Sequence, residues 1–101
     1  MKSSVSLDEG VMTVRLSGEI DHHTARLIRE ETDRLIQQKR PRELRLDFSS
    51  VSFMDSSGLA VVLGAHRRMK ELDGALRVCG VPPQPMKVFA AVRLDRLIRF
   101  E

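Results

Sequence analysis

Residues 44–59 read LRLDFSSVSFMDSSGL, and this stretch decides how the chain folds. Over 44–48, leucine and phenylalanine alternate with charged residues, which is typical of a strand with one buried face. We expect a loop over 49–55. The helix that follows is expected to begin at Ser56 or Ser57, because aspartate and serine favour helix starts.

The rest of the chain repeats these two patterns. Alternation predicts a hairpin over residues 4–17 around the turn Asp8-Glu9-Gly10, a strand at 76–79 and a short last strand at 97–100. Apolar spacings of three and four predict three helices. The first runs from about Thr24 to Arg40, the second from Ser56 or Ser57 to about Leu72, and the third over 86–92. We expect Gly18 to His23 to form a polar connection, Asp21 to cap the first helix, and Pro82 to Pro85 to form a rigid turn. The side chains expected to face the core include Val5, Leu7, Ala25, Ile28, Thr32, Leu35, Ile36, Leu59, Val62, Leu63, Met69, Leu72, Met86, Phe89 and Ala90.

This order of elements predicts an α/β fold. A strand–helix–strand connection implies parallel strands and a right-handed crossover, whereas the hairpin adds an antiparallel pair. The sheet should therefore be mixed, with four to five strands. Because the strands alternate rather than being apolar throughout, we expect helices mainly on one face and a wetter second face. At 101 residues the chain forms one domain, 1–101.

Composition argues against several classes of protein. No apolar run approaches the roughly 20 residues that cross a bilayer, and the first residues lack a signal-peptide pattern. The single cysteine, Cys79, excludes an internal disulfide and fits a reducing cytoplasm. The net charge is +3, but acidic residues are interleaved with the arginines and neither tyrosine nor tryptophan is present to stack on bases. We therefore expect a cytoplasmic protein that contacts neither nucleic acid nor a membrane.

Enzymatic chemistry finds little support. A serine needs a base, and nothing in the sequence places His22, His23 or His66 beside Ser56. Neither a G-x-S-x-G elbow nor a phosphate-binding loop of the G-x-x-x-x-G-K-[ST] type occurs. His22 and His23 are most simply loop residues before a helix and form a poor metal pair. We expect that the protein is not an enzyme and that it binds neither a metal nor a cofactor.

Two interpretations of Asp55-Ser56-Ser57-Gly58 compete. Helix capping alone would explain these residue types. Alternatively, free backbone N–H groups at the helix start could hold a phosphate carried by Ser56. Apolar residues border the serine, and Gly58 would let a phosphate or another backbone come close. A phosphate adds about −1.5 to −2 charges, which Asp55 and Asp21 would oppose, so it would act as a switch.

Several segments together carry a family resemblance. They are Gly18 to Ala25 (GEIDHHTA), Ser52 to Leu59 (SFMDSSGL), Val61 to Gly64 (VVLG) and Ile98 to Glu101 (IRFE). In these segments the chain resembles the anti-sigma factor antagonists of the STAS domain family, above all the sporulation type that acts on the anti-sigma F factor. The similarity runs in register over nearly the whole chain and implies a STAS-like single domain.

The resemblance implies a partner switch. In this family the unphosphorylated antagonist binds an anti-sigma factor that is also a serine kinase, and a sigma factor is released. The kinase uses ATP to phosphorylate the serine that matches Ser56, and a PP2C-type phosphatase removes the phosphate. Asp21 matches the acidic position of the partner-binding surface, and the motif places Met54, Asp55, Ser57 and Gly58 on the same surface. From the residues themselves, Met54 is equally compatible with the core.

Some alternatives stay open. The same fold occurs in general stress-response antagonists, and a nucleotide-binding or scaffold STAS domain is a third class. The resemblance implies a final helix after the segment Arg99-Phe100-Glu101, and the sequence ends at Glu101. We expect the protein to be a monomer when it is alone.

Overall fold

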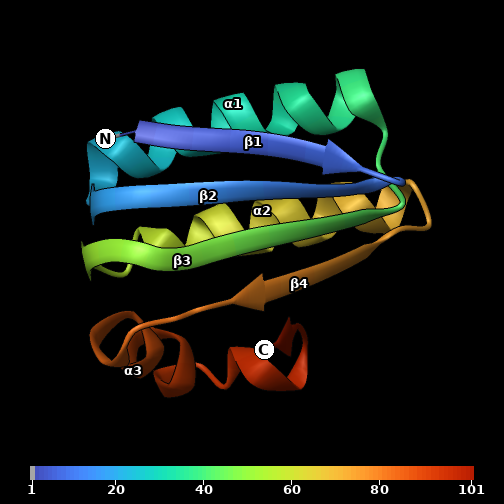
Figure 1. Ribbon diagram of the computed structural model, residues 1–101. Helices are drawn as coiled ribbons and strands as arrows, with labels where there is room; N and C mark the ends of the chain where they lie inside the picture. Colours follow the sequence, from blue (N-terminus) through green and yellow to red (C-terminus); the bar gives the residue numbers. More distant parts are fainter. Residues whose placement is uncertain (1) are drawn as a thin grey trace.

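Five strands lie side by side in one sheet, in the same order as along the chain (Figure 1). The computed structural model describes residues 2–101. β1 is antiparallel to β2, and all other neighbours are parallel, so the predicted mixed sheet is confirmed. The elements are β1 (Lys2–Asp8), β2 (Val11–Ile20), α1 (His22–Lys39), β3 (Glu43–Met54), α2 (Gly58–Glu71), β4 (Ala75–Cys79), α3 (Pro83–Ala91), the 3-10 turn η1 (Leu94–Arg96) and β5 (Arg99–Phe100).

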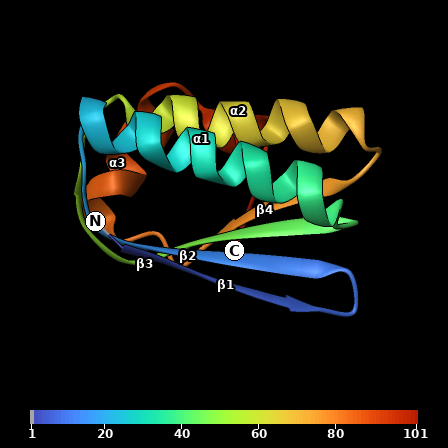
Figure 2. The same cartoon turned by 90° about the horizontal axis from the view of Figure 1, so that it is seen from above.

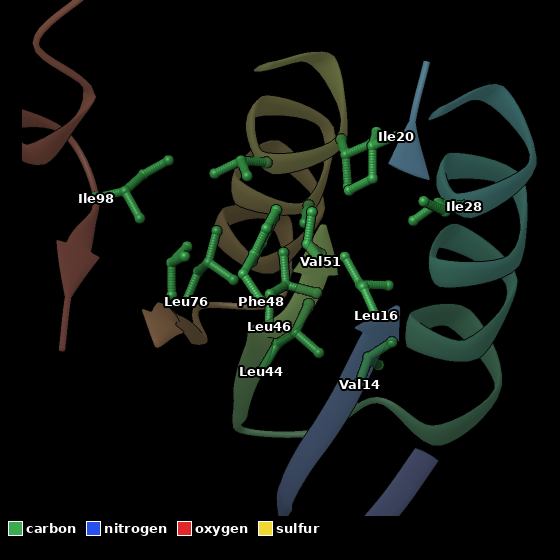
Figure 3. Close-up of a cluster of buried hydrophobic side chains, with 14 of the residues drawn as sticks. Val14, Leu16, Ile20, Ile28, Leu44, Leu46, Phe48, Val51, Leu76 and Ile98 are labelled. Carbon is green, nitrogen blue, oxygen red and sulfur yellow. The ribbon is translucent and has the colours of Figure 1, made fainter. Parts of the chain in front are cut away.

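The three helices cover one face of the sheet, as predicted, and α1 and α2 run side by side (Figure 2). The core between the layers is aliphatic, with side chains from every layer (Figure 3). Its centre is β3, where Leu44, Leu46 and Phe48 are fully buried. α3 joins the core through Phe89, whose ring meets the edge of Phe48 at 5.5 Å between centroids. Burial of each such side chain contributes about 1.5–3 kcal/mol.

The opposite face of the sheet carries charged side chains. Arg15 pairs with Asp47 at 3.1 Å, and Arg77 pairs with Glu43 and, at 3.2 Å, with Glu101. This face is the wetter one that the alternating strands predicted.

At the amino end of the parallel strands, three turns are joined by hydrogen bonds. The Arg42 N–H donates to the Gly10 carbonyl at 3.0 Å, and the Ala75 N–H donates to the Arg42 carbonyl at 3.0 Å. Gly10 has a φ of 82°, which favours glycine. These bonds fix the start of β2, β3 and β4 in register.

The central strands are longer than predicted. We expected a loop over 49–55 and a polar connection from Gly18, but β3 continues to Met54 and β2 to Ile20. The pairing of β2 with β3 shifts register twice, between Arg15 and Ser17 and again after Gly18. The buried residues therefore fall out of strict alternation, which hid the strand from pattern analysis.

Several expected core positions are also wrong. Val5 and Leu7 lie on the helix side of the sheet, opposite Val14 and Met12, yet they are 42% and 50% exposed. β1 is an edge strand with a neighbour on one side only, and these side chains are less covered than those of β2 and β3.

In α2, Leu63 is exposed, and Val61 and Ala65 are buried in its place. The third helix starts earlier than expected because a proline is tolerated in a first turn. As a result Pro85 and Phe89 face inward, whereas Met86 and Ala90 are exposed.

The first helix and the last strand also differ from expectation in their bounds. His22 and His23 are the first two residues of α1 rather than a loop. The last strand is confined to Arg99–Phe100, with Leu97 exposed and Ile98 buried before it.

Candidate functional site

The candidate site lies where β2 and β3 end. Because these strands are parallel, their carboxyl ends meet at one edge of the sheet, and both α1 and α2 begin there (Figures 1 and 2). The Asp55 N–H donates to the Ile20 carbonyl at 3.1 Å and joins the two strand ends. The fold thus brings Asp21 into the same region as Asp55, Ser56 and Ser57.

Ser56 is exposed at the tip of this turn. Its hydroxyl makes no hydrogen bond to any residue of the described part of the chain. Ser57 precedes α2 at the N-cap position and is half-buried, but its side chain makes no capping bond. The capping interpretation therefore fails for both serines. Asp55 performs that task instead, because its Oδ1 accepts from the Ser57 N–H at 2.8 Å.

Most of the amides around Ser56 are not free, although the N–H of Ser56 itself has no acceptor in residues 2–101. The N–H groups of Gly58, Leu59 and Ala60 donate to the carbonyls three residues earlier, at 3.1, 3.1 and 3.2 Å. This tight first turn satisfies the donors that a helix start usually leaves free. The first turn of α2 therefore offers few free donors to a charged group on Ser56.

Asp21 caps α1, as predicted. Its Oδ1 accepts from the Thr24 N–H at 2.9 Å, while the Thr24 hydroxyl accepts from the Asp21 N–H at 2.8 Å. Hydrogen bonds from the Thr24 backbone, and then from its hydroxyl, hold the pKa of Asp21 below its usual value. The side chain is exposed and carries its negative charge at neutral pH.

Met54 and Gly58 lie beneath this surface. Met54 is fully buried, which resolves the choice between core and interface in favour of the core. A β-carbon on Gly58 would overlap the Sδ and Cγ atoms of Met54. Packing against Met54 therefore suffices to explain a glycine at this position. The apolar side chain that does reach the surface here is Phe53, which is 45% exposed.

Sequence analysis missed Gln84. From α3, its Oε1 accepts from the Met54 N–H at 2.8 Å and its Nε2 donates to the Met54 carbonyl at 2.7 Å. The amide thus pairs with the last residue of β3 as a neighbouring strand would. No signal in the sequence joins these residues, because they are separated by 30 positions.

The described residues contain no cluster of three or more histidine, cysteine or acidic side chains that could hold a metal ion. None of the helices in that part of the chain has the length and apolar character that crossing a membrane requires.

Comparison with known proteins gives a consistent result. A sequence profile of the STAS domain matches residues 3–101. The anti-sigma F factor antagonist of Paenibacillus polymyxa is 43% identical over 74 residues, which are 73% of this chain and 63% of that protein. The aligned region thus spans less than two thirds of that relative's length. The anti-sigma-B factor antagonist of Bacillus subtilis (strain 168) is 31% identical over 94 residues, or 93% of this chain and 84% of the relative.

Solved structures agree with these relatives. The anti-sigma factor antagonist SpoIIAA in its unphosphorylated form superimposes with a TM-score of 0.85 at 29% identity, covering 99% of this chain and 88% of that one. The phosphorylated form of the Bacillus cell fate determinant SpoIIAA gives a TM-score of 0.76 at 29% identity, covering 99% and 91%.

Proposed function

Because the chain belongs to the STAS domain family, we propose that it is an anti-sigma factor antagonist whose binding is switched at Ser56. The unphosphorylated form binds an anti-sigma factor that is also a serine kinase, and a sigma factor is released. Phosphorylation of Ser56 ends this binding, and a PP2C-type phosphatase restores it. The observation that carries the proposal is the exposed Ser56, whose hydroxyl has no partner in the described residues.

The surroundings of Ser56 support an electrostatic switch. A phosphate would add about −1.5 to −2 charges next to Asp55 and in the same region as Asp21. The amides of the first turn of α2 are already used, so the chain offers the phosphate little neutralisation. The fold would remain intact while the potential of the docking surface changed, and unfavourable charge pairs at an interface cost several kcal/mol.

In this proposal Ser56 is a substrate and the protein is not an enzyme. No hydrogen bond joins a histidine to Ser56 anywhere in residues 2–101, so the hydroxyl lacks a base of its own. The partner kinase binds the ATP, and this chain needs no cofactor. The proposal places the protein in the cytoplasm as a monomer, where the lone Cys79 would stay reduced.

Phosphorylation is tested with the purified anti-sigma factor kinase of the same genome and ATP, followed by intact-mass and fragment analysis. We expect one phosphate, on Ser56. Ser57→Ala is the matched control and should still be phosphorylated, whereas Ser56→Ala should not. A phosphate on Ser49, Ser50 or Ser52 with Ser56 unmodified would overturn the assignment.

Binding is tested by calorimetric titration of the same anti-sigma factor. We expect Ser56→Asp and Ser56→Glu to weaken binding and Ser56→Ala to retain it. Ser6→Asp adds the same charge on the exposed edge strand β1 and should bind like the wild type. Equal affinities for all these variants would count against the switch.

A second candidate function is a general stress-response antagonist. The B. subtilis anti-sigma-B factor antagonist favours it, because the alignment covers 93% of this chain. Titration of the anti-sigma F and anti-sigma-B factors side by side discriminates the two pathways. Titration of ATP and GTP in the same series tests the nucleotide-binding alternative.

A further inference from the structure

A groove of about 510 Å³ runs between α1 and α2 on the outer surface of the helical layer. Its apolar floor is formed by Ile36 on α1 and by Val61 and Ala65 on α2. The two helices lie side by side in the same direction, and both start at the edge that carries Ser56 (Figure 2). The groove therefore begins near the proposed switch and leads away from it.

Gly64 leaves the α2 wall of this groove open. A β-carbon placed on it would meet no atom within 4 Å, in contrast to one on Gly58. Glycine within a helix costs about 1 kcal/mol relative to alanine. Neither close packing inside the protein nor a positive φ accounts for Gly64. The space beside it is accessible to another molecule.

The charges along the groove are unevenly paired. Its three carboxylates are occupied, because Glu30 lies 3.9 Å from Arg26, and Asp33 and Glu71 both pair with Arg68. Arg29 and Arg67, one on each helix, are exposed and form no ion pair with residues 2–101. The groove thus combines an apolar floor with two free guanidinium groups.

A protein docked on Ser56 would extend over this groove. Gly64 lies seven residues beyond Ser57, which is about 10 Å along a helix. A standard interface buries about 800 Å² on each partner, equivalent to a disc of about 16 Å radius. Gly64 and the two free arginines consequently fall within the area that such a partner covers.

We propose that this groove receives a segment of the anti-sigma factor that carries carboxylates beside small apolar side chains. The inference rests on the proposed function and extends it by identifying the chemistry of the partner. The carboxylates would pair with Arg29 and Arg67, and the apolar side chains would contact Val61 and the open space at Gly64.

The test uses calorimetric titration of the purified anti-sigma factor of the same genome into variants of the full chain. Gly64→Gln fills the groove, and the double variant Arg29→Glu/Arg67→Glu reverses its free charges. We expect each to raise the dissociation constant about tenfold or more. The matched control, Arg34→Glu/Lys70→Glu, makes the same change at exposed positions of the same helices outside the groove and should stay within about twofold.

Thermal unfolding of every variant accompanies the titrations. Gly64→Gln should keep or raise the melting temperature because glutamine is the better helix former. The double variant provides a second test if Gly64→Gln does not fold. Increasing salt should weaken wild-type binding more than binding of Arg29→Glu/Arg67→Glu.

The outcomes separate this inference from the function beneath it. Failure of the wild type to bind would refute the proposed function. Loss of binding in Ser56→Asp, with both groove variants binding like the wild type, would refute only the groove. An equal loss of affinity in Arg34→Glu/Lys70→Glu would also refute the groove, because the change in net charge would then explain the effect. Micromolar binding of ATP or GTP that disappears in Arg29→Glu/Arg67→Glu would make a nucleotide the occupant and overturn the proposal.

Discussion

The side chain of Met54 occupies the space in which a β-carbon of Gly58 would lie. Met54 is the last residue of β3, and Gly58 is the first residue of α2. The contact therefore closes the turn that presents Ser56, with the exposed serine above and the buried methionine below. The position of Ser56 depends on a packing contact between its neighbours, and this contact can be tested by mutation.

We predict that Gly58→Ala destabilises the protein by about 1–3 kcal/mol, because the new methyl group displaces Met54 from a full core. Met54→Ala should cost about 2–5 kcal/mol. The double variant should lose less than the sum, since the smaller side chain leaves room for the methyl group. Chemical denaturation measures all three free energies of unfolding.

Gly64→Ala is the matched control for this cycle. It makes the same change in the same helix but meets open space, so we expect it to stabilise the protein by about 0.4–1 kcal/mol. If Gly58→Ala proved as stabilising as Gly64→Ala, the packing explanation of Gly58 would be wrong.

Gln84→Ala should lower the free energy of unfolding by about 1–3 kcal/mol. The substitution leaves the partly buried N–H and carbonyl of Met54 without their partners. Amide hydrogen exchange at Met54 should accelerate, and this local readout separates the loss of these bonds from a general loss of stability. Gln37→Ala changes an exposed glutamine of α1 and should stay within about 0.5 kcal/mol of the wild type.

The cap at Asp21 makes stability depend on pH. Hydrogen bonds from Thr24 lower the pKa of Asp21 in the folded state, whereas the unfolded chain has the ordinary value of about 3.9. The contribution should therefore be complete above that value and be lost as the pH falls through the folded pKa. Melting curves of the wild type and Asp21→Ala should be several degrees apart at pH 7 and approach each other in acid. Asp21→Asn can still accept the Thr24 hydrogen bond and should remain close to the wild type at pH 7.

Cys79 should react slowly. Burial raises the pKa of its thiol, and the Sγ lies 3.6 Å from the Leu46 carbonyl. Because the thiolate is the reactive form, we expect labelling by a disulfide reagent at pH 8 to be about tenfold slower than for free cysteine. Denaturation should abolish the difference. Equal rates in the folded protein would show that the thiol is accessible and ordinary.

The sequence predicted those parts of the fold in which the spacing of apolar residues matches the pattern of burial. Leu44, Leu46 and Phe48 alternate and are buried, and Asp21 caps the helix whose apolar stripe follows it. The end of β3 was missed because Val51 and Met54 are three residues apart, a spacing that a register shift allows and strict alternation does not. Val5 alternates correctly, but alternation does not distinguish an edge strand such as β1 from an inner strand, and Val5 is exposed.

The site was predicted in part for a similar reason. The cap at Asp21 followed from residue types beside an element boundary. The functions of Gly58 and Gly64 could not be told apart, because they depend on whether another side chain fills the adjacent space. Gln84 was invisible for the same reason, since its partner is a backbone segment 30 residues away.

The hydrogen-bonded turns around Gly10, Arg42 and Ala75 lie at the amino end of β3, and the switch serine follows its carboxyl end. β3 has 12 residues, and its two ends lie at opposite edges of a molecule whose longest dimension is 31 Å. A fluorophore or an immobilising tether attached at the turn edge would leave an incoming protein unobstructed. That edge is the natural anchoring point for a surface-based or optical assay of this molecule.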